Sequence, residues 1–153
     1  EPIRQFSRNI GVAFQILNDL NDWEGDEHNK LLAGGDVLGG RPTLLWALAL
    51  ASLNETEQAE LLSLASHECD LSESQRIHRV EQLYRKARVF EQANRLIDKH
   101  EQRALEVIGS LESEPLQRML LYLVDTVLQR HEPAAPALVT MTPVGTLPIV
   151  ASN

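Results

Sequence analysis

The residues with the clearest chemical potential are Asn18, Asp19 and Asp22, near the start of the chain. Their oxygen ligands lie at positions i, i+1 and i+4. Hard divalent cations such as Mg²⁺ prefer oxygen ligands and are commonly held by one or two carboxylates together with substrate phosphate. No cysteine or clustered histidine accompanies them, which argues against zinc. The spacing indicates a Mg²⁺ site with these three residues as ligands, although a solvated acidic helix face is equally compatible with spacing alone.

The segment 24–41 follows directly and contributes two cations, Lys30 and Arg41. It contains five glycines, at which the backbone can approach an anion closely. Lysine and arginine are the usual phosphate-binding side chains. Loops of this length without regular structure are usually functional or disordered. We therefore expect Lys30 and Arg41 to bind a phosphate group that the metal ion also contacts.

The carboxylates must be positioned by the segment that carries them. Its apolar residues recur at three- and four-residue steps, which predicts a helix from about Pro2 to Trp23. Gln15, Asn18, Asp19 and Asp22 fall on the opposite face from that stripe. Because further apolar residues lie between the two faces, we expect a helix buried on most sides. Burial of carboxylates without partners is costly, so cations should face the acidic stripe.

The remaining pattern is helical as far as about residue 130. Residues 42–53 are apolar nearly all round and predict a central, buried helix. Capping signals at Asn54 and Ser72 predict two more helix starts. The apolar stripe after Ser72 reaches Leu111, with a break expected between Leu83 and Arg88, and a last helix begins near residue 113.

Four prolines interrupt the final segment, where only residues 139–150 resemble a strand. The organisation predicted is an all-α domain over residues 1–131 and a non-helical tail over 132–153.

The composition restricts the class of protein. The 153 residues carry a net charge of −8, which argues against non-specific binding to nucleic acid or to an anionic membrane surface. One cysteine, Cys69, allows no intramolecular disulfide, so a reducing, cytoplasmic setting is the default expectation. No apolar run reaches the length of a membrane span. We expect a cytoplasmic protein with no stable membrane span and no nucleic-acid partner.

The run from Phe14 to Asp22, preceded by Gly11, resembles the second aspartate-rich motif of the trans-isoprenyl diphosphate synthases, or polyprenyl synthetases. That family has a Phe-Gln pair followed by Asp-Asp-x-x-Asp. Downstream, Lys30, the pair Gly35-Asp36 and the run from Gly40 to Thr43 are similar to its lysine, its Gly-Asp loop and its Gly-Lys-x-Thr motif before an apolar helix. The resemblance implies the C-terminal part of an isoprenoid-synthase-type helical bundle.

The resemblance also implies an activity. The family uses Mg²⁺ to ionise an allylic diphosphate, which isopentenyl diphosphate then attacks. By the motif, Gln15, Asp19 and Asp22 would be catalytic, Asn18, Asp19 and Asp22 would hold metal, and Lys30 and Arg41 would bind the substrate diphosphate.

This chain departs from the family pattern in three places. Asn18 replaces the first aspartate of the motif, and Arg41 replaces a lysine. A first aspartate-rich motif does not occur in the 153 residues. The chain is therefore expected to be a fragment, inactive alone, whose partner is the missing N-terminal half of the same enzyme.

Two alternatives remain beside the synthase. The first is a catalytically silent or regulatory subunit that binds a partner through its apolar helices. The second is a class I terpene cyclase, although the segment from Lys30 to Arg41 fits a synthase better. A half-bundle would expose apolar helix faces, so a homo-oligomer is expected in either case.

Overall fold

The computed structural model describes residues 1–24, 34–66 and 69–129, and their regular structure is entirely helical. The all-α prediction is therefore confirmed. The predicted tail over 132–153, with its possible strand, lies outside the described residues. The helices are α1 (Pro2–Glu24), α2 (Gly35–Leu38), α3 (Leu44–Ser52), α4 (Glu55–Ala65), α5 (Glu73–Lys86), α6 (Val89–Gly109) and α7 (Glu114–Val127).

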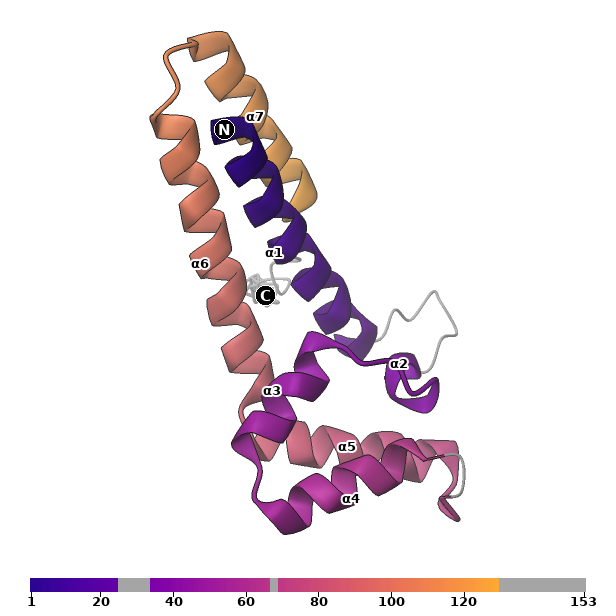
Figure 1. Ribbon diagram of the computed structural model, residues 1–153. Helices are drawn as coiled ribbons and strands as arrows, with labels where there is room; N and C mark the ends of the chain where they lie inside the picture. The colour runs from indigo at the N-terminus through magenta and orange to yellow at the C-terminus, as the bar shows by residue number, and fades with distance from the viewer. Residues whose placement is uncertain (25–33, 67–68, 130–153) are drawn as a thin grey trace, which may run out of the picture.

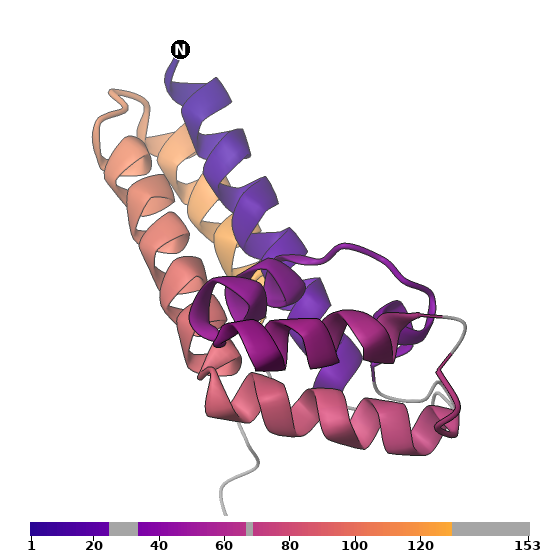
Figure 2. The same cartoon turned by 60° about the horizontal axis from the view of Figure 1, so that its bottom comes forward.

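The helices form a long arm and a crossing pair. Figure 1 shows α1, α6 and α7 side by side along the arm, with the N-terminus at its far end. Helices α4 and α5 run antiparallel across the other end, and α3 leads into them (Figure 2). Helix α2 lies beside the C-terminal end of α1. Within the described residues, no helix is long and apolar enough to cross a membrane.

The helix starts follow the side chains that cap them. Asn54 accepts a hydrogen bond from the Glu57 amide at 3.0 Å, and the Glu57 carboxylate accepts one in return from the Asn54 amide. Ser72 and Gln75 make the same reciprocal pair at the start of α5. Both predicted capping boxes are confirmed. Helix α3 starts slightly later than predicted, at Leu44, because Thr43 is its N-cap residue.

The break between α5 and α6 falls within the predicted interval. Arg88 adopts a left-handed backbone conformation with φ of 53°, although it is neither glycine nor asparagine. The Gln92 side-chain amide donates a 2.8 Å hydrogen bond to the Ala87 backbone carbonyl and so satisfies one acceptor at the end of α5. The turn directs α5 against α4, while α6 continues along α1.

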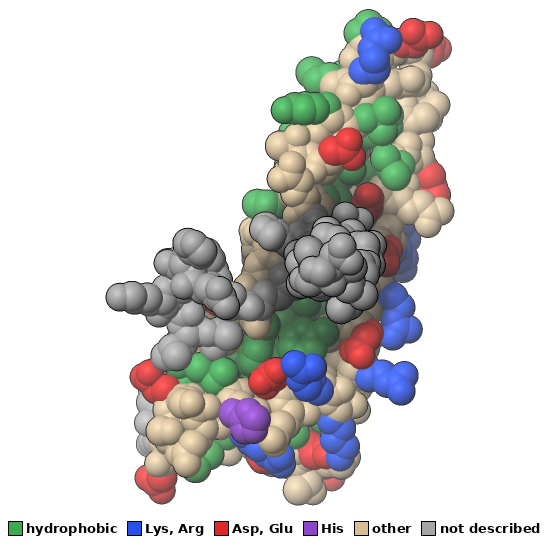
Figure 3. Space-filling view, turned by 180° about the vertical axis from the view of Figure 1, so that it is seen from behind, with side chains coloured by type: hydrophobic (Ala, Val, Ile, Leu, Met, Phe, Trp, Pro, Cys, Tyr) green, Lys and Arg blue, Asp and Glu red, His purple; other side chains and the backbone are tan. Residues whose placement is uncertain are grey.

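The chain buries one face of α1 and part of α3. Phe6, Ile10 and Ala13 on α1 are buried in the core. The expectation that α1 is covered on most sides is wrong for the described structure, since Val12 and Phe14 are exposed. Figure 3 shows other hydrophobic side chains at the surface of the arm.

Helix α3 departs from its prediction in the same way. Only Leu45 and Ala49 of this helix are fully buried, with Leu53 directly after it, so it is not buried all round. Its central position is confirmed, because α3 contacts α1, α4, α5 and α6.

Candidate functional site

Asp19 is the most buried of the predicted site residues, with 7% of its surface exposed. Its Oδ2 accepts a hydrogen bond from the Leu44 amide at 3.2 Å, and its Oδ1 accepts one from the Gln15 side chain at 3.1 Å. Leu44 is the first residue of α3, so the carboxylate lies at the positive end of that helix. The partner of this buried charge is thus a helix N-terminus, where we had expected a cation.

Asp22 lies one helical turn further along α1, next to α2. Its Oδ2 accepts a long hydrogen bond of 3.5 Å from the Asp36 amide, and its backbone carbonyl accepts one from Gly34 at 3.0 Å. Burial raises the pKa of the Asp22 carboxyl above its ordinary value, and the nearby charges of Asp36 and Asp19 raise it further. The Asp36 amide and Arg41 act in the opposite direction. The site therefore has an excess of negative charge that a cation would relieve.

Gly34 fixes the approach of α2 to α1. Its φ of 79° is a conformation that favours glycine. A Cβ atom there would also lie 3.2 Å from the Trp23 ring. A side chain at this position would therefore be strained and would crowd the side chains of Trp23 and Ile77.

Arg41 lies at the rim of the site. Its guanidinium is 3.1 Å from the Asp36 carboxylate, and its side chain is 76% exposed. A cavity of about 590 Å³ opens beside this pair. It is lined by Val12, Gln15, Ile16, Asp19, Asp36, Arg41, Pro42, Thr43 and Leu44.

The structure brings some predicted residues together and separates others. Gln15, Asp19 and Arg41 share the cavity, whereas Asn18 is exposed and neither Asn18 nor Asp22 lines it. Lys30 lies outside the described residues. No group of three His, Cys, Asp or Glu side chains in the described ranges is arranged to hold a metal ion. The carboxylates of the described residues therefore do not by themselves enclose a metal ion.

Three residues near the cavity were absent from the predicted site. Asp36 lines the cavity and contributes a further carboxylate. The available signal was its place in the Gly35-Asp36 pair of the resembling motif. Thr43 caps α3 and lines the cavity. Tyr84 comes from α5, and nothing in its sequence context indicated a place near the acidic residues.

Tyr84 is fully buried, and its ring packs on Trp23 and Phe90 with centroid distances of 5.0 and 6.0 Å. Its hydroxyl makes no hydrogen bond of standard geometry within the described residues, although the Thr43 side chain lies close enough to interact with it. Burial raises the pKa of the phenol well above its ordinary value, with Asp19 and Asp36 adding to the rise and Thr43 opposing it. The phenol therefore stays neutral beside the acidic site.

The comparisons with known proteins agree with this arrangement. A model of the polyprenyl synthetase family matches residues 1–86. The chain is 24% identical over 132 residues to the all-trans-nonaprenyl-diphosphate synthase (geranyl-diphosphate specific) of Rhodobacter capsulatus, which covers 85% of this chain and 39% of that protein. It is 26% identical over 130 residues to the short chain isoprenyl diphosphate synthase of Methanothermobacter thermautotrophicus, covering 84% and 39%.

A third relative, the short chain isoprenyl diphosphate synthase of Methanocaldococcus jannaschii, is 33% identical over 66 residues, which cover 42% of this chain and 20% of that protein. The chain thus spans about two fifths of the length of the first two curated relatives. No solved structure matches it significantly. Because the family match covers more than half of the residues and includes Asp19 and Asp22, the chain belongs to the polyprenyl synthetase family.

Proposed function

We propose that this chain forms part of a polyprenyl diphosphate synthase, a prenyltransferase that condenses an allylic diphosphate with isopentenyl diphosphate. One observation carries the proposal. Asp19, Asp36 and Arg41 line one cavity near the C-terminal end of α1, and Asp22 lies one turn beyond Asp19, where it accepts a hydrogen bond from the Asp36 amide. This end of α1 is suited to bind a diphosphate, because a divalent cation can bridge diphosphate oxygens to protein carboxylates.

The donor set fits Mg²⁺. Asp19 and Asp22 offer carboxylate oxygens, and the exposed Asn18 offers a neutral carbonyl oxygen. Burial is the main cause of the raised pKa of Asp22 and the charges of Asp36 and Asp19 add to it, so a bound cation would favour the ionised carboxylate. When bound, Mg²⁺ would neutralise charge on the departing diphosphate.

The side chains around the metal ligands have separate tasks. Gln15 orients the Asp19 carboxylate through their 3.1 Å hydrogen bond. Arg41 would exchange its exposed pairing with Asp36 for a substrate phosphate, and the bidentate guanidinium suits that contact. The neutral phenol of Tyr84 adds no further negative charge beneath the site.

The direct test is prenyl transfer by the full-length protein, in which this chain is joined to the rest of the synthase fold. Asp19→Ala should abolish transfer of the allylic group to isopentenyl diphosphate. Asp125→Ala, on the exposed side of α7, is the matched control and should retain full activity. Unchanged turnover in Asp19→Ala would remove Asp19 from the catalytic site.

A catalytically silent subunit is the second candidate, because Asn18 occupies the first position of the motif and the described residues assemble no group of three metal-binding side chains. Asn18→Asp discriminates between the candidates in the same full-length protein. In a synthase, the added charge should lower the Mg²⁺ concentration needed for half-maximal activity. A silent subunit would show no turnover with either residue and would alter the activity of a catalytic partner.

A further inference from the structure

A second cavity lies between the first half of α1 and the second half of α6, and the proposed function does not use it. Its volume is about 640 Å³. Asn9, which lines it, precedes Asp19 by ten residues, or ~15 Å along the helix axis. The lining residues are Gln5, Arg8, Asn9, His100, Arg103, Glu106, Val107 and Ser110.

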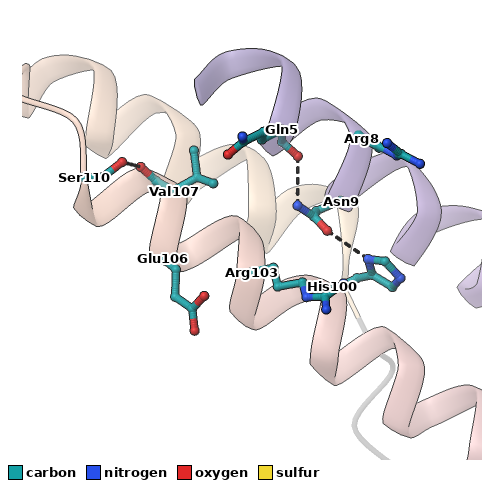
Figure 4. A pocket seen from close by; sticks show the side chains of 8 residues that line it. All are labelled: Gln5, Arg8, Asn9, His100, Arg103, Glu106, Val107 and Ser110. Atoms are coloured by element: carbon teal, nitrogen blue, oxygen red, sulfur yellow. Dashed lines mark hydrogen bonds between the residues drawn. The ribbon is translucent and has the colours of Figure 1, made fainter. Parts of the chain in front are cut away.

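A chain of hydrogen bonds orients His100 in this cavity (Figure 4). The Asn9 side-chain amide donates to the Gln5 carbonyl at 2.9 Å, which leaves its Oδ1 directed at His100. The distance from that oxygen to His100 Nδ1 is 2.9 Å, so Nδ1 must carry a proton. The other ring nitrogen, Nε2, is then the atom that can meet a ligand.

Positive charge surrounds this histidine although the chain as a whole carries −8. Burial lowers the pKa of His100, and the nearby charges of Arg103, Lys99 and Arg8 lower it further. These cations come from both helices that form the cavity. An anion placed among them would gain from each charge and would reverse the effect on His100.

One acidic residue, Glu106, also lines the cavity. Its carboxylate accepts a 3.2 Å hydrogen bond from the Gln102 side chain, and Figure 4 shows it turned away from His100. It therefore reduces the attraction for an anion without occupying the place between Arg8, His100 and Arg103.

We propose that the groove between α1 and α6, at Arg8, His100 and Arg103, binds a phosphate group, either as inorganic phosphate or as the phosphate of a small phosphomonoester. The two guanidiniums supply charge and paired donors for phosphate oxygens. A monoprotonated phosphate can donate its own hydrogen to neutral Nε2, whereas sulfate cannot. The cavity is larger than one phosphate ion, so an attached organic group fits beside Val107.

The test uses NMR of the 153-residue chain, with its histidine ring signals followed during titration at constant ionic strength. Sodium phosphate and glycerol phosphate are the two probes. The His100 signals should move to a saturating limit, while those of His78 on α5 provide an internal reference and should stay in place. Saturation with both probes at similar concentrations identifies the phosphate group as the ligand, and tighter binding of glycerol phosphate would assign a role to the organic group.

Charge variants then locate the site. Arg8→Gln and Arg103→Gln should each weaken phosphate binding about three- to tenfold, as expected for one charge contact near a protein surface. Glu106→Gln should tighten phosphate binding by a similar or smaller factor. An unfolded variant could not bind phosphate more tightly, so this result cannot arise from loss of structure. Arg118→Gln on α7 should leave the affinity unchanged.

Two further comparisons separate this site from others. Asp19→Asn should not alter phosphate binding, so the groove can be confirmed or rejected independently of the proposed synthase activity. Sulfate should bind more tightly at a pH at which His100 is protonated than at one at which it is neutral, because neutral Nε2 has no hydrogen to donate to it. Equal, non-saturating shifts of His100 and His78, or wild-type affinity in both arginine variants, would overturn the proposal.

Discussion

Replacing Asp19 or Asp22 with asparagine should have opposite effects on folding stability, although both residues are expected to serve the same metal ion. The two carboxylates are one helical turn apart on α1 but have different surroundings. Asp19 accepts hydrogen bonds on both oxygens, one of them at the start of α3. Asp22 has one long hydrogen bond and lies among other negative charges.

The magnitude for Asp19→Asn follows from those contacts. An asparagine oxygen can still accept from the Leu44 amide, and Gln15 can turn its side chain to accept from the new Nδ2, but both hydrogen bonds lose the carboxylate charge. Exchanging a buried hydrogen bond to a charged group for a neutral one costs about 1 kcal/mol, and loss of the charge at the helix N-terminus adds ~0.3–1 kcal/mol. We expect the free energy of unfolding to fall by about 1–2 kcal/mol at pH 7.

Asp22→Asn should raise the free energy of unfolding at pH 7. The asparagine oxygen can still accept from the Asp36 amide, and the repulsion from Asp36 and Asp19 disappears. The pKa of Asp22 is higher in the folded chain than in the unfolded chain, so its ionisation destabilises the fold as pH rises through that range. Below about pH 4 the wild-type carboxyl is increasingly protonated and the advantage of the variant should shrink.

Urea unfolding followed by circular dichroism measures both effects, at pH 7 and at a pH below 4. The same two variants should both lose Mg²⁺-dependent binding of inorganic diphosphate in the full-length protein. Stability and function would then change in different directions for Asp22→Asn. A loss of stability of equal size in the two variants would refute the assignment of distinct surroundings.

Two further predictions concern strained or unpartnered groups. Tyr84→Phe should leave the free energy of unfolding unchanged or raise it by up to ~1 kcal/mol, because the hydroxyl that it removes is buried without a hydrogen bond; a clear loss in urea unfolding would show that the hydroxyl is satisfied. Arg88→Gly should raise the melting temperature, since a left-handed backbone costs ~1 kcal/mol for residues other than glycine. Arg85→Gly, in the last turn of α5, should instead lower it, because glycine disfavours the helix and the ion pair with Glu81 is lost.

Local signals in the sequence were sufficient for most of the helices. Asn54 and Ser72 specify helix starts through contacts with residues three positions later, so their capping boxes could be read from spacing. The break before α6 was predictable as an interval, but the residue that makes it was not. Arg88 is an unfavourable residue for a left-handed turn, and tertiary packing overrides its preference.

The site was predictable only where its contacts are local or its motif is recognisable. Spacing alone left Asp19 and Asp22 compatible with a solvated helix face, and the resemblance to the family motif singled them out. The partner of Asp19 is a backbone amide 25 residues away, which no side-chain pattern reveals. Tyr84 reaches the site from α5 through the arrangement of helices. The cation expected beside Asp19 is replaced by the N-terminus of α3, which stabilises a carboxylate as a lysine would. Arg41 does lie near Asp22, as expected, and Lys30 lies outside the described residues.

The last prediction concerns assembly. Helix α1 exposes Val12 and Phe14, and α7 exposes Met119, Tyr122 and Leu123, so apolar side chains lie uncovered on two helices of the arm. Exposed apolar groups of this kind favour association. We predict that the 153-residue chain forms a dimer or a larger assembly through these helices.

Sedimentation velocity at low micromolar concentration checks this prediction. Met119→Glu with Tyr122→Glu should shift the chain towards monomer without unfolding it, because both side chains are already exposed. Glutamate at two exposed polar positions, Gln102→Glu with Thr126→Glu, adds the same charge and should leave the assembly intact. Self-association stabilises the folded chain more strongly at higher protein concentration. The melting temperature of the wild type should therefore rise with concentration, whereas that of the α7 variant should not. A compact wild-type monomer with concentration-independent unfolding would contradict the argument and would require that the chain cover these side chains by itself.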